Sequence, residues 1–258
     1  GRPWHSAMLH CQVLLNPATS HAPTLWHIKM NDQFQILSDF KGFGNPNGKI
    51  WFVGLEEATN FETDFDQILK GYSIEYIPAE KGSIQKDAKK YGNSYTKVYD
   101  VMAKIMTGLF PKTDWRTYRN NLLLTKEGNE FQMNLYPLGK KSLNAWPEFY
   151  QRQFGFKTKQ EYLTKVQADR FPGLYNYWKK NAPDFTICFG IGNIDDFKKA
   201  FKLNTEFELS ESNLYLFPTD KVLITPFFDN RNMGQDRIDK TVTTIQNLFT
   251  KNSNNEKT

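Results

Sequence analysis

Four short, nearly continuous apolar runs constrain the fold of this chain more than any other feature. They are residues 49–55 (KIWFVGL), 130–138 (EFQMNLYPL), 184–191 (DFTICFGI) and 221–228 (KVLITPFF). Runs that are apolar throughout, rather than alternating, are typical of strands covered on both faces. A shorter run at 213–217 predicts a fifth strand that pairs beside the last of the four.

Amphipathic patterns with helical spacing lie between these runs. The clearest covers residues 95–109, and others cover 160–180, broken near Pro172, 195–202 and 236–249. Strands that alternate with helices indicate an α/β fold with a parallel sheet. We therefore expect a three-layer α/β/α domain with a central, mainly parallel sheet of four to five strands.

The two ends of the chain differ in composition from the rest. Residues 1–29 contain no Asp or Glu and all four histidines of the chain, and Met30 then opens a segment that reads like an ordinary protein start. We expect residues 1–29 to be a leader added for expression and residues 30–250 to form one domain. The polar segment 251–258 (KNSNNEKT) is expected to be a disordered tail.

The composition from Met30 onward limits the chemistry. The chain has 33 basic and 28 acidic residues, and without Arg2 and Lys29 the excess of basic residues is small, which permits nucleic-acid binding without implying it. Cys188 is the one cysteine of this part and favours a reducing, cytoplasmic setting. No apolar stretch is long enough for a membrane span, no metal-ligand spacing occurs, and a monomer is expected. With no histidine, any catalysis depends on carboxylates, amides, Arg, Lys or Tyr.

Ligands of open parallel sheets bind beyond the carboxyl ends of the strands. The segments that follow the four predicted strands there are 54–61 (GLEEATNF), 134–139 (NLYPLG), 190–193 (GIGN) and 225–234 (TPFFDNRNMG). We expect the functional site where these four segments converge.

The order of the four segments resembles the uracil-DNA glycosylase superfamily, over about residues 49–249. GLEEA (54–58) is similar in position to the water-activating motif of that family, and FQMNLYPL (131–138) looks most like the Asn-containing strand of its single-strand-selective monofunctional branch. Segment 187–201 is similar to the third strand and the helix after it, and segment 225–234 takes the place of the late motif. The resemblance implies recognition and hydrolytic release of a deaminated base flipped from DNA, without a cofactor.

Two departures from the family pattern concern the chemistry. The late motif of the family usually supplies a histidine that stabilises the departing base, and Thr225 stands in its place here. The first motif usually offers Asp or Asn near a Pro, whereas this chain offers Glu56 and Glu57 and no Pro. Either other residues perform these roles, or the fold is kept and the activity lost.

Two pairs of residues carry the predicted catalysis. Glu56 or Glu57, in the loop that Gly54 opens, is expected to orient a water and stabilise an oxocarbenium-like sugar; the alternative is a solvated pair or a helix cap. Asn230 or Arg231 is expected to support the leaving base anion in place of the histidine. Arg231 can equally grip a phosphate or lie exposed in a turn.

Three further residues are predicted to bind the base, together with Gly54 and Asn232 of the two loops. Asn134 has an amide that both donates and accepts, and can therefore pair with uracil O4 and N3–H; the alternative is a structural amide. Phe61 is placed to stack on the base, with core packing as its alternative, and Tyr136 is placed to wall the pocket.

The stretch 81–97 (KGSIQKDAKKYGNSYTK) is rich in lysine, with interleaved tyrosines. As a basic loop it is suited to following a single-stranded DNA backbone through Lys89, Lys90 and Lys97, although charge runs also form plain solvated faces. Two other function classes stay open: a catalytically silent nucleic-acid-binding module, and an α/β protein that binds a small nucleoside or nucleotide.

Overall fold

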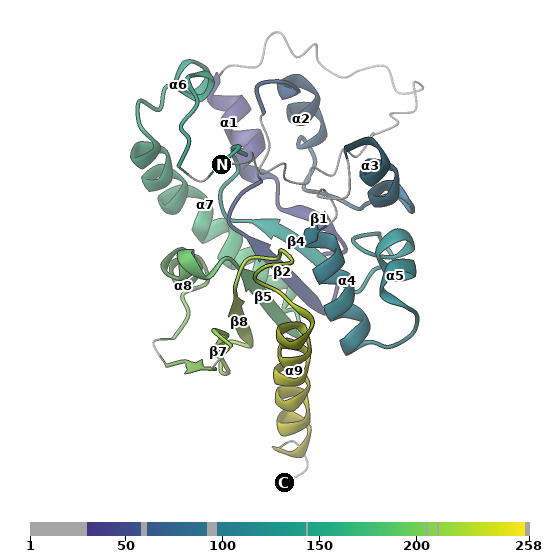
Figure 1. Cartoon of the computed structure of the whole chain (residues 1–258). Helices are drawn as coiled ribbons and strands as arrows, with labels where there is room; N and C mark the ends of the chain where they lie inside the picture. Colours follow the sequence, from purple (N-terminus) through teal and green to yellow (C-terminus); the bar gives the residue numbers. More distant parts are fainter. Residues whose placement is uncertain are drawn as a thin grey trace.

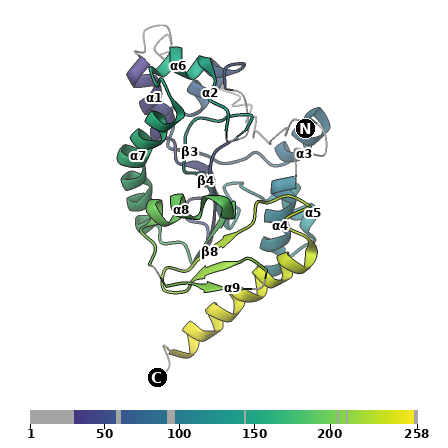
Figure 2. The ribbon, with the colours of Figure 1, turned by 60° about the vertical axis from the view of Figure 1, so that its left-hand side comes forward.

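The computed structural model describes residues 30–57, 61–91, 97–142, 144–204, 206–210 and 212–255. The predicted leader, residues 1–29, lies outside the described residues. Helices lie on both sides of one sheet: α7 (Lys159–Asn181) and α8 (Ile194–Phe201) on one side, α4 (Lys97–Leu109) and α9 (Gln235–Asn255) on the other (Figures 1 and 2). The predicted α/β class is confirmed.

The sheet has eight strands in the order β3-β1-β4-β2-β5-β8-β7-β6. Its centre is parallel and consists of β4 (Glu130–Asn134), β2 (Ile50–Gly54), β5 (Phe185–Phe189) and β8 (Val222–Thr225). These are the four predicted strands. The predicted fifth strand is β7 (Tyr215–Phe217), which pairs antiparallel with β8.

Three short strands make the sheet larger and more mixed than predicted. β1 (Gly42–Gly44) pairs antiparallel with β4, β3 (Tyr76–Ile77) pairs parallel with β1, and β6 (Glu208–Leu209) pairs antiparallel with β7. The expected count of four to five strands was therefore wrong. The reason is physical: two or three residues are too few to show a hydrophobic period.

The remaining helices surround the edge that carries β1 and β3. They are α1 (Met30–Asp39), α2 (Phe65–Gly71), α3 (Ser83–Tyr91), α5 (Trp115–Asn121) and α6 (Glu148–Phe154), and a 3₁₀ turn, Ile191–Asn193, precedes α8. α1 packs on α2, α6 and α7, and α3 packs on α5, which packs on α4.

Two helices differ from the predicted boundaries. α7 does not break at Pro172 but continues through it. Pro172 is exposed, while Phe171 and Leu174 beside it are buried, so core packing holds the helix together across the missing hydrogen bond. α9 continues past Phe249 to Asn255, so the backbone of the predicted tail is helical from Lys251 to Asn255.

Candidate active site

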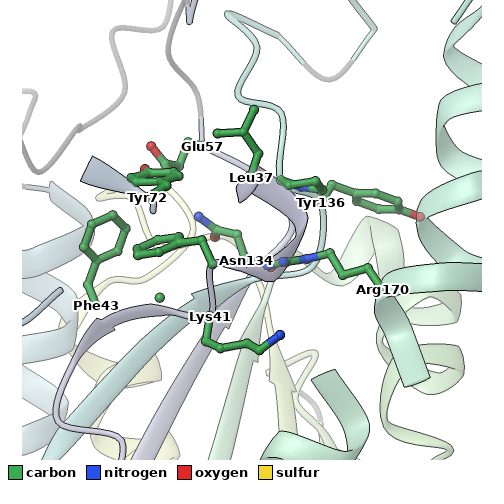
Figure 3. Close-up of a pocket in the computed structure, with 11 residues that line it drawn as sticks. Leu37, Lys41, Phe43, Glu57, Tyr72, Asn134, Tyr136 and Arg170 are labelled. Carbon is green, nitrogen blue, oxygen red and sulfur yellow. The ribbon is translucent and has the colours of Figure 1, made fainter. Parts of the chain in front are cut away.

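A pocket lies at the carboxyl ends of β2 and β4, where they meet β1 and α7 (Figure 3). Its cavity measures about 10 Å³, the volume that roughly one water molecule needs. A nucleobase therefore enters only if side chains of the wall move. The lining residues are Leu37, Phe40, Lys41, Gly42, Phe43, Glu57, Tyr72, Asn134, Tyr136, Pro137 and Arg170.

Asn134 is the last residue of β4 and lies opposite Gly54, the last residue of β2. A Cβ atom at position 54 would lie 2.5 Å from Oδ1 of Asn134 and 2.9 Å from the ring of Phe189. Gly54 therefore makes the space in which the amide of Asn134 sits. The backbone carbonyl of Asn134 accepts a hydrogen bond from Arg170, but its side-chain amide bonds to none of the described residues. The amide keeps its donors and its acceptor for a ligand.

The carboxyl group of Glu57 enters the pocket from the loop after β2 (Figure 3). It accepts a hydrogen bond of 2.5 Å from the hydroxyl of Tyr72. Burial raises the pKa of Glu57 to about 7, and the Tyr72 hydroxyl offsets part of that rise. A carboxyl group with this pKa is suited to exchanging protons near neutral pH.

Glu56 does not line the pocket. Its carboxylate pairs with the ammonium of Lys140, whose side chain is fully buried, and the backbone N–H of Lys140 donates to the carbonyl of Glu57 at 2.8 Å. Burial raises the pKa of Glu56 to about 7, against the lowering effect of Lys140. The pair ties the loop after β2 to the loop after β4, which gives Glu56 and Lys140 a structural role.

The aromatic wall consists of residues that the sequence did not indicate. The rings of Phe40 and Tyr72 stack with centroids 3.9 Å apart and planes at 11°, and Phe43 meets Phe40 edge-on at 5.1 Å. Phe61, predicted to stack on a base, is fully buried and packs edge-on against Tyr72. Phe61 therefore belongs to the core and supports the wall from behind.

Tyr136 reaches the pocket, but its ring points away from Asn134 (Figure 3). The ring packs near Tyr162 and Phe171, and the hydroxyl donates to Asp196 at 2.8 Å. The predicted wall is therefore formed only in part by Tyr136. Consecutive side chains alternate across a strand, but the chain has already left β4 at Leu135, so this alternation did not fix the direction of Tyr136.

Two cations also line the pocket. Arg170, on α7, is buried and donates to three backbone carbonyls, those of Ser38, Asn134 and Leu135. Burial lowers the pKa of Arg170 to about 10, and burial with the charge of Arg170 lowers the pKa of Lys41. Positive charge beneath Asn134 favours a ligand that is, or becomes, anionic. Arg170 was not singled out from the sequence because it stands within an ordinary helical pattern.

The late loop after β8 does not reach this pocket. Asp229 is buried, and its Oδ1 accepts hydrogen bonds from the backbone N–H groups of Arg231 and Asn232, which holds the loop as a turn. Asn230, Arg231 and Asn232 are exposed, and none of them lines the pocket. These three residues therefore lie in an exposed turn, the alternative that the sequence had left open for Arg231.

The predicted backbone-contacting lysines lie on helices. The stretch interpreted as a basic loop contains α3, with Lys89 and Lys90 exposed in its last turn, and Lys97 begins α4. Residues 92–96 of that stretch lie outside the described residues. The interpretation as a loop was therefore wrong for 83–91, where Ile84 and Asp87 are buried on one face of a helix.

Searches against protein-family models, curated proteins and solved structures find no match to this chain. The resemblance to uracil-DNA glycosylases consequently remains a hypothesis. None of the described helices is both long and apolar enough to cross a membrane. Within the described part of the chain, no three His, Cys, Asp or Glu side chains are grouped as metal ligands.

Proposed function

We propose that this protein recognises a deaminated base, uracil foremost, flipped from DNA and hydrolyses its N-glycosidic bond. The observation that supports this most directly is the pairing of Asn134 and Glu57 in one pocket. Among the described residues the amide has no hydrogen-bond partner, and it shares the pocket with a carboxyl group of raised pKa, so a base-reading group and a water-activating group occur together. Helices on both sides of the sheet also agree with the three-layer fold that the resemblance implies.

In this proposal Asn134 pairs with the base edge, donating to O4 and accepting from N3–H of uracil. Cytosine presents the opposite pattern, which is worth on the order of 1–3 kcal/mol of discrimination. Glu57, as the carboxylate, takes a proton from water while the water oxygen bonds to the sugar carbon and the bond from that carbon to the base nitrogen breaks. Since the pKa of Glu57 is about 7, this carboxylate is available at neutral pH.

Aromatic and cationic neighbours complete the site. Phe40 and Tyr72 take the stacking role predicted for Phe61. Their rings are stacked on each other, so a base that displaces one ring would stack on the other. The base departs with the electron pair of the broken bond, as an anion. Arg170 is the buried positive charge of the pocket and stabilises that anion electrostatically, the role that the sequence had assigned to Arg231.

A second candidate is a nucleic-acid-binding module of the same fold without catalysis. It is favoured by the late loop, where the residue that replaces the family histidine, Thr225, is fully buried. The Thr225 hydroxyl donates to the carbonyls of Pro226 and Cys188 at 2.9 and 3.3 Å. Thr225 therefore cannot replace the histidine, and catalysis depends on Arg170 for the leaving group.

The test is base release from single-stranded and duplex oligonucleotides that carry one uracil, hypoxanthine or xanthine, followed by alkaline cleavage of the abasic product. We expect release that Glu57→Gln and Asn134→Ala abolish. Asn230→Ala, a change of the same kind in an exposed turn outside the pocket, is the matched control and should retain full activity. Absence of release from every substrate, with intact DNA binding, would leave the second candidate.

A further inference from the structure

The positive charge of the chain is concentrated on three neighbouring helices and the loops between them. Residues 83–121, from the start of α3 to the end of α5, contain eight Lys or Arg and three Asp or Glu. Their net charge of eight minus three, +5, equals that of the whole chain, so the rest of the chain is balanced. α3, α4 and α5 lie next to one another beside the sheet in both views (Figures 1 and 2).

All three acidic residues of this segment are committed within the fold. Asp87 is buried, Asp100 pairs with Arg119 at 2.5 Å, and Asp114 caps α5 by accepting hydrogen bonds from the backbone N–H groups of Arg116 and Thr117. The cations are arranged differently. Lys86, Lys89, Lys112 and Arg116 are exposed, and none of these four forms an ion pair with the described residues.

The three helices are held to one another, so their backbones have fixed relative places. The backbone N–H of Gly82, just before α3, donates to the carbonyl of Asn120 in α5 at 2.7 Å. Trp115 begins α5, and its ring is flanked by Lys104 of α4 at 5.1 Å and by Arg116 at 4.5 Å. Charges from α4 and α5 therefore lie around one aromatic residue, and α3 is joined to α5 beside them.

We propose that this surface, defined by Lys86, Lys89, Lys104, Lys112, Trp115 and Arg116, binds the phosphate backbone of a nucleic acid. Exposed cations on α3, on the loop after α4 and on α5, with the half-buried Lys104 of α4 among them, suit the successive phosphates of a polymer, whereas a single phosphate group needs donors gathered in one recess. The surface is separate from the pocket, since none of its residues lines the pocket. The inference stands on these charges alone, whether or not the pocket releases a base.

The test measures binding of a fluorescent single-stranded oligonucleotide by anisotropy over a range of salt concentrations. The variant Lys86→Gln/Lys89→Gln/Arg116→Gln should bind roughly 10- to 100-fold more weakly near 0.1 M salt, and the slope of log affinity against log salt should become smaller by about 2, since three phosphate contacts contribute about 0.7 each. The matched control changes three exposed lysines elsewhere, Lys70, Lys157 and Lys180, to Gln. It loses the same net charge and should bind within twofold of the unaltered protein.

If both variants unfold at the same midpoint temperature as the unaltered protein, a folding defect is excluded as the cause of weaker binding. Equal affinity of the three-residue variant and the unaltered protein would overturn the proposal, and so would an equal loss in the control. Competition by a poly-glutamate peptide as effective as the oligonucleotide would also overturn it, because the surface would then be a site for acidic protein. Base release at saturating oligonucleotide reports on the pocket separately, since these substitutions leave the pocket intact.

Discussion

Removal of one hydroxyl group, in Tyr72→Phe, tests the electrostatics of the pocket. The ring keeps its stacking on Phe40 and its contact with Phe61, and the 2.5 Å hydrogen bond to Glu57 is lost. A hydrogen bond to a charged group contributes about 1.5–3 kcal/mol and one between neutral groups about 1 kcal/mol. The carboxylate form of Glu57 therefore loses about 1 kcal/mol more than the neutral form, which is close to one pKa unit.

The sign of the effect on stability follows from the raised pKa. Burial moves the pKa of Glu57 from 4.5 to about 7 in the folded protein, so its stabilising contribution is complete below the unfolded pKa and is lost as the pH rises through the folded pKa. Tyr72→Phe raises the folded pKa further. The loss of unfolding free energy caused by Tyr72→Phe should thus grow from about 1 kcal/mol at pH 5 to about 2 kcal/mol at pH 9.

The assay is urea unfolding of both proteins from pH 5 to pH 9, with Tyr175→Phe as a control that removes the hydroxyl of a partly buried tyrosine outside the pocket. In the proposed reaction, the acid limb of the pH profile of kcat/KM should also shift upward by about one unit. A cost that is the same at every pH would refute the reasoning, because the Tyr72 hydroxyl would then not discriminate between the two forms of Glu57.

Three further changes test other parts of the structure by unfolding measurements. Glu130→Gln removes a buried carboxyl group whose pKa is raised to about 7 by burial. Between pH 4 and pH 8 the free energy of unfolding of the unaltered protein should therefore fall by about 3 kcal/mol relative to that of the variant. Parallel curves of unfolding free energy against pH would contradict this. Gly54→Ala should cost about 1–3 kcal/mol, because its Cβ meets Asn134 and Phe189, and no loss would mean that the amide has room to move. Glu56→Gln should lower the free energy of unfolding by about 3–5 kcal/mol, because it leaves Lys140 charged and buried. The double variant Glu56→Leu/Lys140→Met should recover most of that loss. If the double variant stays as unstable as Glu56→Gln, the ion pair contributes more than an apolar replacement.

The central strands and the long helices were predictable from the sequence because each has its own local pattern, a continuous apolar run for a strand and a helical hydrophobic period for a helix. β2, β5 and β8 are buried throughout, which is the property that their apolar runs reported. The shorter elements depend on partners elsewhere in the chain. β1 consists of Gly42, Phe43 and Gly44, and a Cβ at position 42 would lie 2.0 Å from the carbonyl oxygen of Gln132. Its place is set by close approach to β4, which no local pattern reveals.

The basic stretch shows how composition can conceal a helix. Lys81 to Lys97 looks like a loop because lysine dominates it, yet Ile84 and Asp87, three residues apart, are buried on one face of α3. Two buried positions in one short segment are too few to predict a helix. The lysines of this stretch lie on a helix that packs on α5, and not on a loop.

The position of the candidate pocket was predictable only in part: it lies at the carboxyl ends of β2 and β4, whereas segments 190–193 and 225–234, also expected there, do not line it. Parallel pairing places Gly54 opposite Asn134, so the ends of two strands 80 positions apart in the sequence meet, as the rule for open sheets requires. Which of the two adjacent glutamates enters the pocket depends on distant side chains. Lys140 takes Glu56 into a buried pair, and Tyr72 holds Glu57 at the pocket wall. Lys140 follows β4 and Tyr72 follows α2, so the choice between the glutamates is made by tertiary contacts. The pair is therefore better described as one residue that anchors two loops and one residue that lines the candidate pocket than as two equivalent carboxylates.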